Sequence, residues 1–391
     1  MLIKRLALKN ILSFHDAVVE LGQLNVLIGP NAVGKSNLIE IIGLLQAAPA
    51  NLATAILRGG GVRQWLWLGD REPSTASIEC ELILTREQDV GPLGYQVEFS
   101  DEAGGFVIVG EALSRSTVPI DLEEAPAYFA RHYNQAGYGA QAKLARVLDE
   151  TMKFLPGESV LSQFKSPIDS TPITEVGNHF AQIRIFREFR TGPGSPARYG
   201  ISTSVSKDAL ADGSDNLALM LHELDFLGVH ERIRSYLRRF CERFEDVKVN
   251  VGEGLARAYL REAGLVEMLS AIRMSDGTLK FLSLLAALFH PKPPPLMCIE
   301  EPEIGLHPDA MQLVAEALVE ASESMQLIVT THSDALIDYL TDRPDTVLVC
   351  ERDFDNGTQI KRLSKEHLKA WLEHYTLGQL WRKGEIGGGR W

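Results

Sequence analysis

The chain has 391 residues, of which 45% are hydrophobic and 23% are charged, and these values exclude a disordered, collagen-like or coiled-coil protein. The length predicts two lobes or one large elaborated domain. The 39 Lys and Arg residues against 52 Asp and Glu residues give a net charge of −13. This balance excludes a surface that is positive all over, but a local basic groove remains compatible with it.

In chain order, the first 28 residues predict three short strands, at 2–8, 17–21 and 24–28. Strands at 77–85, 95–100 and 105–110 predict an antiparallel sheet. The segments 125–133 and 140–154 have helical patterns, and so does 232–244, which carries apolar residues along one stripe.

After Gly264 the chain alternates between helices and strands, which predicts a mainly parallel sheet. The helices are expected at 279–289, 310–323 and 334–340, and the strands at 296–299, 327–330 and 346–350. We divide the chain into an N-terminal part (1–115), a helical insert lobe (116–269) and a C-terminal part (270–391).

The cysteines predict free thiols rather than disulfides, because Cys80, Cys241, Cys298 and Cys350 lie far apart and form no Cys-x-x-Cys pair. The N-terminus has no signal-peptide pattern, and the most apolar windows are too short to span a bilayer. We therefore expect a soluble, cytoplasmic protein.

The third strand runs into a phosphate-binding loop of the form G-x-x-x-x-G-K-S, the Walker A motif, and a helix follows. Its residues are Gly29, Pro30, Asn31, Ala32, Val33, Gly34, Lys35 and Ser36, followed by Asn37. The glycines let backbone N–H groups turn toward phosphates, and the helix directs its positive dipole end at them. Lys35 is expected to reach the β- and γ-phosphates, and the Ser36 hydroxyl is expected to ligate Mg²⁺.

Two glutamates, Glu300 and Glu301, follow the strand at 296–299, at the end where α/β sheets place their ligands. Alone, such a pair is also typical of a solvated loop or a helix cap. Together with the phosphate loop, the pair predicts a Walker B site. Glu300 is expected to hold Mg²⁺, directly or through water, and Glu301 is expected to polarise the attacking water.

Two further signals follow strand ends or open helices. His332 comes just after the strand at 327–330, where it could reach a γ-phosphate, although a lone histidine there is more often structural. Ser275 and Gly277 open the helix at 279–289, where a side chain and backbone N–H groups together bind a phosphate. Ser275 is equally a good N-terminal cap.

With these motifs in this order, the chain resembles the ABC-type ATPase heads of the RecF/SMC group, and within it bacterial predicted ATPases related to the overcoming-lysogenization-defect family. The strings that carry the resemblance are Ile28-Gly-Pro-Asn-Ala-Val-Gly-Lys-Ser-Asn37, Ser275-Asp-Gly-Thr278, Ile299-Glu-Glu-Pro-Glu-Ile-Gly-Leu-His-Pro308, Thr330-Thr-His-Ser333 and Leu8-Lys-Asn-Ile-Leu-Ser-Phe14. The similarity is specific over roughly 1–45 and 270–345.

The resemblance implies an α/β fold, the ABC-type P-loop NTPase head, with a mainly parallel core sheet, an N-terminal antiparallel sheet and a helical lobe. It implies a homodimer that closes around two ATP molecules, with Glu301 as hydrolytic base, His332 as switch histidine, and Ser275 and Gly277 on the ATP of the partner protomer. The signature is Ser-Asp-Gly-Thr rather than Ser-Gly-Gly-Gln, so an aspartate and a threonine stand where the related signature has glycine and glutamine. Only 59 residues follow His332, too few for a Toprim nuclease, so an effector or nuclease would be a separate chain.

Two arginine-rich segments predict a local DNA-binding surface. They contribute Arg184, Arg187, Arg190 and Arg198, and Arg232, Arg234, Arg238, Arg239 and Arg243. A solvated helix with internal salt bridges is the alternative for the second segment. The sequence thus predicts an ATPase in DNA metabolism, DNA repair or phage defence. The alternatives are an ATP-dependent scaffold for a partner protein and a transporter ATPase subunit.

Overall fold

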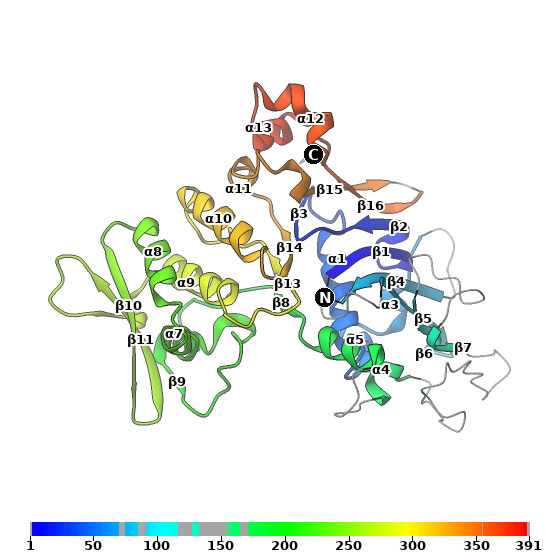
Figure 1. The fold of residues 1–391 in the computed structure, drawn as a ribbon, viewed down its shortest axis with the longest axis horizontal. Coiled ribbons are helices and arrows are strands. Elements are labelled where there is room, and N and C mark those ends of the chain that lie inside the picture. The colour runs from blue at the N-terminus through cyan, green and yellow to red at the C-terminus, as the bar shows by residue number, and fades with distance from the viewer. Residues whose placement is uncertain are drawn as a thin grey trace. The chain divides into compact units, whose positions relative to one another are not determined.

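A computed structural model describes residues 2–69, 75–84, 91–115, 127–132, 155, 157–164, 171–353 and 355–388. The chain folds as two compact units (Figure 1). Unit 1 contains residues 1–184, 345–368 and 383–391, and unit 2 contains residues 185–344 and 369–382.

The sheet of unit 1 has the strand order β7-β6-β5-β4-β1-β2-β16-β15-β3. Neighbouring strands are antiparallel except β15 and β3, which are parallel. Its strands are β1 (Leu2–Ile11), β2 (Phe14–Glu20), β3 (Leu24–Ile28), β4 (Thr75–Ile83), β5 (Leu93–Glu102), β6 (Gly105–Ser114), β7 (Ala127–His132), β15 (Val347–Asp353) and β16 (Gly357–Arg362). The strands predicted in the first 110 residues are confirmed.

The described helices of unit 1 pack in pairs, α1 against α2 and α5, α2 against α3, and α5 against α4. They are α1 (Lys35–Ala47), α2 (Leu52–Arg58), α3 (Val62–Trp65), α4 (Val160–Gln163) and α5 (Pro172–Ala181). All five residues of β3 are buried, the polar Asn25 among them, as in strands that are covered on both faces. β3 therefore provides a rigid base for the loop that follows it.

The helix predicted at 125–133 is wrong, because residues 127–132 form strand β7, which pairs with β6. Phe129 and Ala130 are buried there, and the neighbouring strand supplies the backbone hydrogen bonds that a local helical pattern does not reveal. The segment predicted as a helix at 140–154 lies outside the described residues.

Unit 2 contains two sheets. The first has the order β14-β13-β8, with β13 and β14 parallel, and the second has the order β10-β11-β12, with β9 also paired to β11. The strands are β8 (Arg184–Phe186), β9 (Ile201–Ser202), β10 (Phe244–Gly252), β11 (Leu255–Glu262), β12 (Leu269–Ser270), β13 (Leu296–Glu300) and β14 (Gln326–Thr330). The helices are α6 (Pro196–Tyr199), α7 (Leu217–Phe226), α8 (His230–Phe240), α9 (Asp276–Leu288), α10 (Met311–Ala321), α11 (Asp334–Asp338) and α13 (Leu377–Lys383). Helix α12 (Lys365–Leu372) crosses the boundary between the units, and β8 and α13 each have one end residue, Arg184 and Lys383, in unit 1.

Helix α9 is the centre of unit 2. Every residue from Thr278 to Leu288 is buried, and α7, α8 and α10 pack against the helix (Figure 1). A helix that is mostly apolar and buried on every face belongs to a core. Because the body of α9 is enclosed in this way, its N-terminus at Ser275 and Asp276 is held in a defined place.

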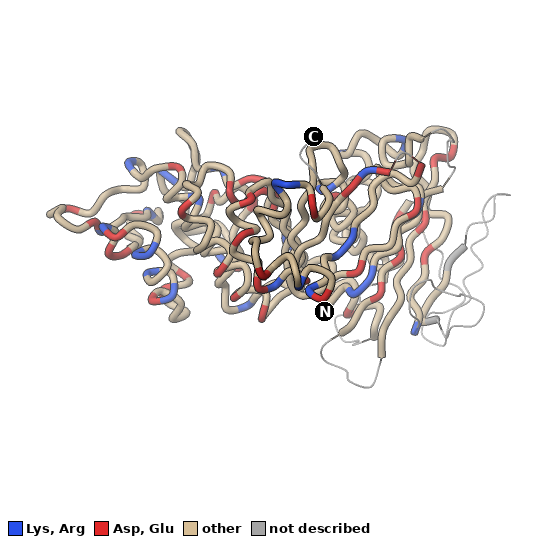
Figure 2. Tube along the Cα trace, turned by 90° about the horizontal axis from the view of Figure 1, so that it is seen from above, with Lys and Arg blue, Asp and Glu red and all other residues tan. Residues whose placement is uncertain are grey.

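Acidic and basic residues are interspersed along the described chain (Figure 2). None of the helices in the described part of the chain combines the length and the hydrophobicity that crossing a bilayer requires.

Candidate functional site

The loop between β3 and α1 depends on glycine at both ends. The φ angle of Gly29 is +148° and that of Gly34 is +107°, in the region that L-residues with side chains rarely adopt. A Cβ atom on Gly34 would also collide with the hydroxyls of Thr358 and Ser13. The backbone conformation at Gly29 and Gly34, and the side chains packed behind Gly34, therefore leave room only for glycine at these two positions.

Lys35 lies across this loop. Its side chain is buried, and its Nζ donates hydrogen bonds to the carbonyl oxygens of Gly29, at 2.7 Å, and Pro30, at 2.8 Å. Helix α1 begins at Lys35 without a side-chain cap on Gly34 and without an acidic residue in its first turn. The positive end of the helix dipole is thus open to an anion, as phosphate sites at helix N-termini require.

Thr358, in strand β16, supports the loop from behind. It is fully buried, and its Oγ1 lies 2.6 Å from the carbonyl oxygen of Val33 and 2.7 Å from the Oγ of Ser13. Thr358 was not predicted from the sequence, because no motif marks it. The only signal for Ser13 was its place in the string Leu8–Phe14.

In unit 2, Glu300 is the last residue of β13 and Glu301 follows it, so both glutamates stand at the expected end of the strand. The Glu300 side chain is 14% exposed, and its Oε1 lies 3.9 Å from the Nε of Arg187. Glu301 has a φ of +46°, and its N–H donates to the carbonyl oxygen of Thr330, at the end of β14, over 3.0 Å. Left-handed backbone at a non-glycine residue is rare and concentrates at functional sites.

His332 joins the glutamates at the same edge of the sheet. Its Nε2 lies 3.7 Å from Oε1 of Glu301, and both side chains are about one third exposed. The backbone N–H of His332 donates to Oε1 of Glu303 over 2.6 Å. Glu303 was not predicted as a functional residue, although it stands in the same Glu-Glu-Pro-Glu string.

The predicted signature lies at the start of α9. Ser275 is the N-cap, and its Oγ accepts a hydrogen bond from the N–H of Thr278 over 3.1 Å. A Cβ atom on Gly277 would lie 3.0 Å from the carbonyl oxygen of Gly305, which follows the two glutamates. The structure therefore places the segment after the glutamates directly against the first turn of α9.

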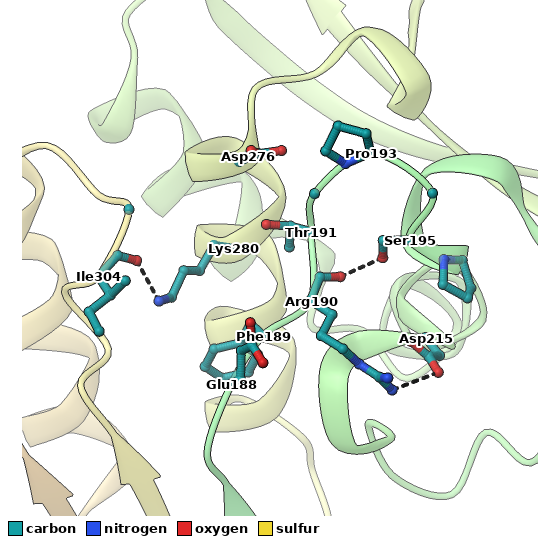
Figure 3. A pocket seen from close by; sticks show the side chains of 14 residues that line it. Glu188, Phe189, Arg190, Thr191, Pro193, Ser195, Asp215, Asp276, Lys280 and Ile304 are labelled. Atoms are coloured by element: carbon teal, nitrogen blue, oxygen red, sulfur yellow. Dashed lines mark hydrogen bonds and ion pairs between the residues drawn. The ribbon is translucent and has the colours of Figure 1, made fainter.

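Lys280 makes a second connection between α9 and this segment. Its side chain is largely buried, and its Nζ donates to the carbonyl oxygen of Ile304 (Figure 3). Burial lowers the pKa of Lys280, and the nearby carboxylates of Glu303, Glu188 and Glu301 oppose that effect. A cavity of about 570 Å³ opens beside Lys280, and Arg190, Asp215 and Asp276 also line it.

Several of the arginines predicted to contact DNA form ion pairs with acidic residues. Besides Arg187, the pairs are Arg190–Asp215 at 3.1 Å, Arg232–Glu320 at 2.6 Å and Arg239–Glu316 at 2.6 Å. Arg184 is half-buried in β8. Arg198 is 9% exposed, so its prediction as part of a basic surface is wrong: it binds backbone carbonyls inside unit 2.

Each unit thus brings together its own predicted residues. Unit 1 contains the whole phosphate loop, from Gly29 to Asn37. Unit 2 brings Glu300, Glu301 and His332 to the ends of two neighbouring parallel strands, with the segment that follows the glutamates packed against the signature.

Two solved structures are similar to nearly the whole chain. One is an SMC head bound to the C-winged helix domain of ScpA, with a TM-score of 0.57, 14% identity, and coverage of 94% of this chain and 99% of that chain. The other is an SMC head with an extended coiled coil, bound to the C-terminal domain of ScpA, from Pyrococcus furiosus, with a TM-score of 0.55, 13% identity, and coverage of 95% and 98%. No curated protein matches the chain by sequence.

The chain has the α/β fold of SMC heads, which confirms the fold class predicted from the sequence. Within that class, the family model described as "AAA domain, putative AbiEii toxin, Type IV TA system" matches residues 24–118 and 141–338. The chain belongs to this family of AAA domains. The closer relation to the overcoming-lysogenization-defect family stays a prediction.

Proposed function

We propose that this chain hydrolyses ATP to ADP and phosphate in a Mg²⁺-dependent reaction, and that two copies close around two ATP molecules. The observation that carries the proposal is the loop between Gly29 and Gly34, with the buried Lys35 across it and the uncapped N-terminus of α1 behind it. Backbone N–H groups and one fixed ammonium are what a triphosphate needs.

In this proposal Lys35 binds the β- and γ-phosphates, and Glu301 orients the attacking water and accepts its proton. His332, 3.7 Å from Glu301, donates to the γ-phosphate. Phosphoryl transfer needs positioning and charge neutralisation more than covalent help, and these are the roles that the three residues would have.

The oxygen donors for Mg²⁺ are the hydroxyl of Ser36 and the carboxylate of Glu300. These are the hard ligands that Mg²⁺ prefers, and one or two from the protein are enough when phosphates and water complete the shell. When bound, Mg²⁺ neutralises the charge that develops on the phosphates. Glu300 fits this role because its carboxylate is largely buried at the strand end.

In the closed dimer, Ser275 and Gly277 of one copy bind the γ-phosphate of the ATP held by the other copy. The contact between Gly277 and Gly305 supports this arrangement, since it connects the signature to the segment beside the hydrolytic residues. Hydrolysis would remove the γ-phosphate and let the copies separate.

The proposed setting is the cytoplasm, in DNA metabolism, DNA repair or phage defence, with DNA bound through Arg184, Arg187, Arg190, Arg232 and Arg239. The family description names a toxin of a type IV toxin–antitoxin system, which is compatible with defence. A scaffold that recruits a partner protein is the second candidate. It is favoured by the acidic partners of Arg190, Arg232 and Arg239, and by the ScpA domains bound to the two SMC heads.

Two variants test the ATPase. Lys35→Ala should abolish ATP binding and hydrolysis, whereas Glu301→Gln should keep ATP binding, lower kcat by on the order of a hundredfold or more, and hold the ATP-bound dimer. Lys207→Gln is the matched control, because Lys207 forms an exposed ion pair with Glu223. Hydrolysis at the parental rate by both site variants would refute the assignment.

Duplex-DNA binding separates the two settings. The purified protein would be titrated with duplex DNA, with and without ATP, at two salt concentrations. Binding that weakens as salt rises is expected of arginine contacts to phosphates. Absent or salt-insensitive binding would favour the scaffold.

A further inference from the structure

One buried arginine holds the segment that leads into the signature. Arg198, in the short helix α6, donates hydrogen bonds from its guanidinium to backbone carbonyls on two sides. The acceptors are Thr191 at 2.6 Å, Ala271 at 3.2 Å, Ile272 at 3.2 Å and Met274 at 2.7 Å. Three of these carbonyls belong to the last turn before Ser275. A planar fork with several donors suits this arrangement, and a lysine could not satisfy the same set.

The same guanidinium forms an ion pair with Asp276. Asp276 is the first residue of α9, directly between Ser275 and Gly277. It occupies the position where the related signature, Ser-Gly-Gly-Gln, has a glycine. The Asp276 side chain is 59% exposed, whereas that of Arg198 is 9% exposed, so the carboxylate lies at the surface and its counter-charge lies beneath it.

A carboxylate at this place has an electrostatic cost for the proposed site. An acidic residue in the first turn favours the helix, but it opposes the approach of a second anion to the same helix terminus. Asp276 would repel the γ-phosphate that Ser275 and Gly277 are proposed to bind. Arg198 supplies the positive charge that offsets this repulsion.

We propose that Arg198 is a positioning residue of the signature, which orders the residues before Ser275 and neutralises Asp276 so that the N-terminus of α9 accepts the γ-phosphate of a second copy's ATP. The inference rests on the proposed function, because it concerns the strength of ATP-driven dimerisation. It explains how a signature with an aspartate retains an anion site.

The test is a double-mutant cycle that removes the charges of Arg198 and Asp276, carried out on the full chain. Wild type, Arg198→Gln, Asp276→Asn and the double variant would be compared for dimer formation by sedimentation, with Mg²⁺ and a non-hydrolysable ATP analogue. Lys207→Gln is the control for loss of an unrelated surface cation. Equilibrium binding of the nucleotide to the monomer, and thermal melting, would be measured for each variant.

Arg198→Gln should weaken dimerisation and Asp276→Asn should strengthen it, each by about two- to fivefold per site, the effect of one charge at a helix N-terminus. The double variant should return toward wild type, and the differences should shrink as salt rises. Nucleotide binding to the monomer should stay the same in all four proteins.

A purely structural role predicts another result, since Arg198→Gln and the double variant would then be equally impaired. That outcome would overturn the inference, as would weaker dimerisation of Asp276→Asn. The second criterion applies even if Arg198→Gln fails to fold. If the wild-type protein remains monomeric with the nucleotide analogue, the proposed dimer itself is refuted. That result differs from a change in the relative dimerisation strengths of the variants, which tests only the role of Arg198.

Discussion

The hydroxyl of Thr358 donates a hydrogen bond to the carbonyl oxygen of Val33 across 2.6 Å, and so connects two segments that lie 325 residues apart in the chain. Thr358 also contacts Ser13, whose carbonyl accepts the N–H of Thr358 over 2.8 Å. The phosphate loop is therefore supported from behind by strand β16 and by the turn between β1 and β2. Because Thr358 is fully buried, its hydroxyl has no access to solvent as an alternative partner.

Thr358→Val should weaken ATP binding by about fivefold, which corresponds to roughly 1 kcal/mol for one hydrogen bond. Valine keeps the shape of the side chain but leaves the Val33 carbonyl without this donor, so the loop loses part of its preorganisation. Thr358→Ser keeps the hydroxyl and is the matched control. Calorimetric titration with ATP gives both affinities, and equal affinity for the valine variant and wild type would show that this bond does not order the loop.

Glu303→Ala should lower kcat by about tenfold, because it leaves the N–H of His332 without its carboxylate acceptor at a cost of roughly 1–3 kcal/mol. The affinity for ATP should change little, since Glu303 binds the backbone of His332 and is not part of the phosphate loop. Steady-state hydrolysis and equilibrium binding would be measured side by side. Glu303→Gln retains an oxygen acceptor and should recover most of the turnover. Equal loss in the alanine and glutamine variants would point to the charge of Glu303 instead.

Lys280 should give the free energy of unfolding an alkaline pH dependence. Burial lowers the pKa of Lys280 in the folded protein below the ordinary value of 10.5. At pH values between the folded-state pKa and the ordinary pKa, the unfolded chain therefore binds more protons than the folded protein. Stability from this group therefore rises with pH through that window. Urea unfolding of wild type and Lys280→Met, at several pH values up to about 10, should give a flatter pH dependence for the variant. Parallel pH profiles would contradict this prediction.

Much of the fold was accessible from local patterns. The strand at 24–28 and the helix within α9 were predicted because mostly apolar runs of strand or helix length indicate buried elements. Strand β7 was predicted as a helix, since its pairing with β6 depends on residues distant in the chain. The site motifs were visible because phosphate chemistry requires particular residues at close spacing, as in the loop from Gly29 to Ser36.

The sequence by itself therefore determined the class of the protein, through short motifs whose chemistry is local. Only the tertiary structure decided which residues support those motifs. Thr358 behind Val33, Glu303 on the N–H of His332, and Arg198 beneath Asp276 all act across long separations in the chain. It also decided that Arg198 is buried, because a guanidinium finds several backbone carbonyls only where distant segments converge. Spacing along the chain carries no information about such partners, so they had to be read from the folded units.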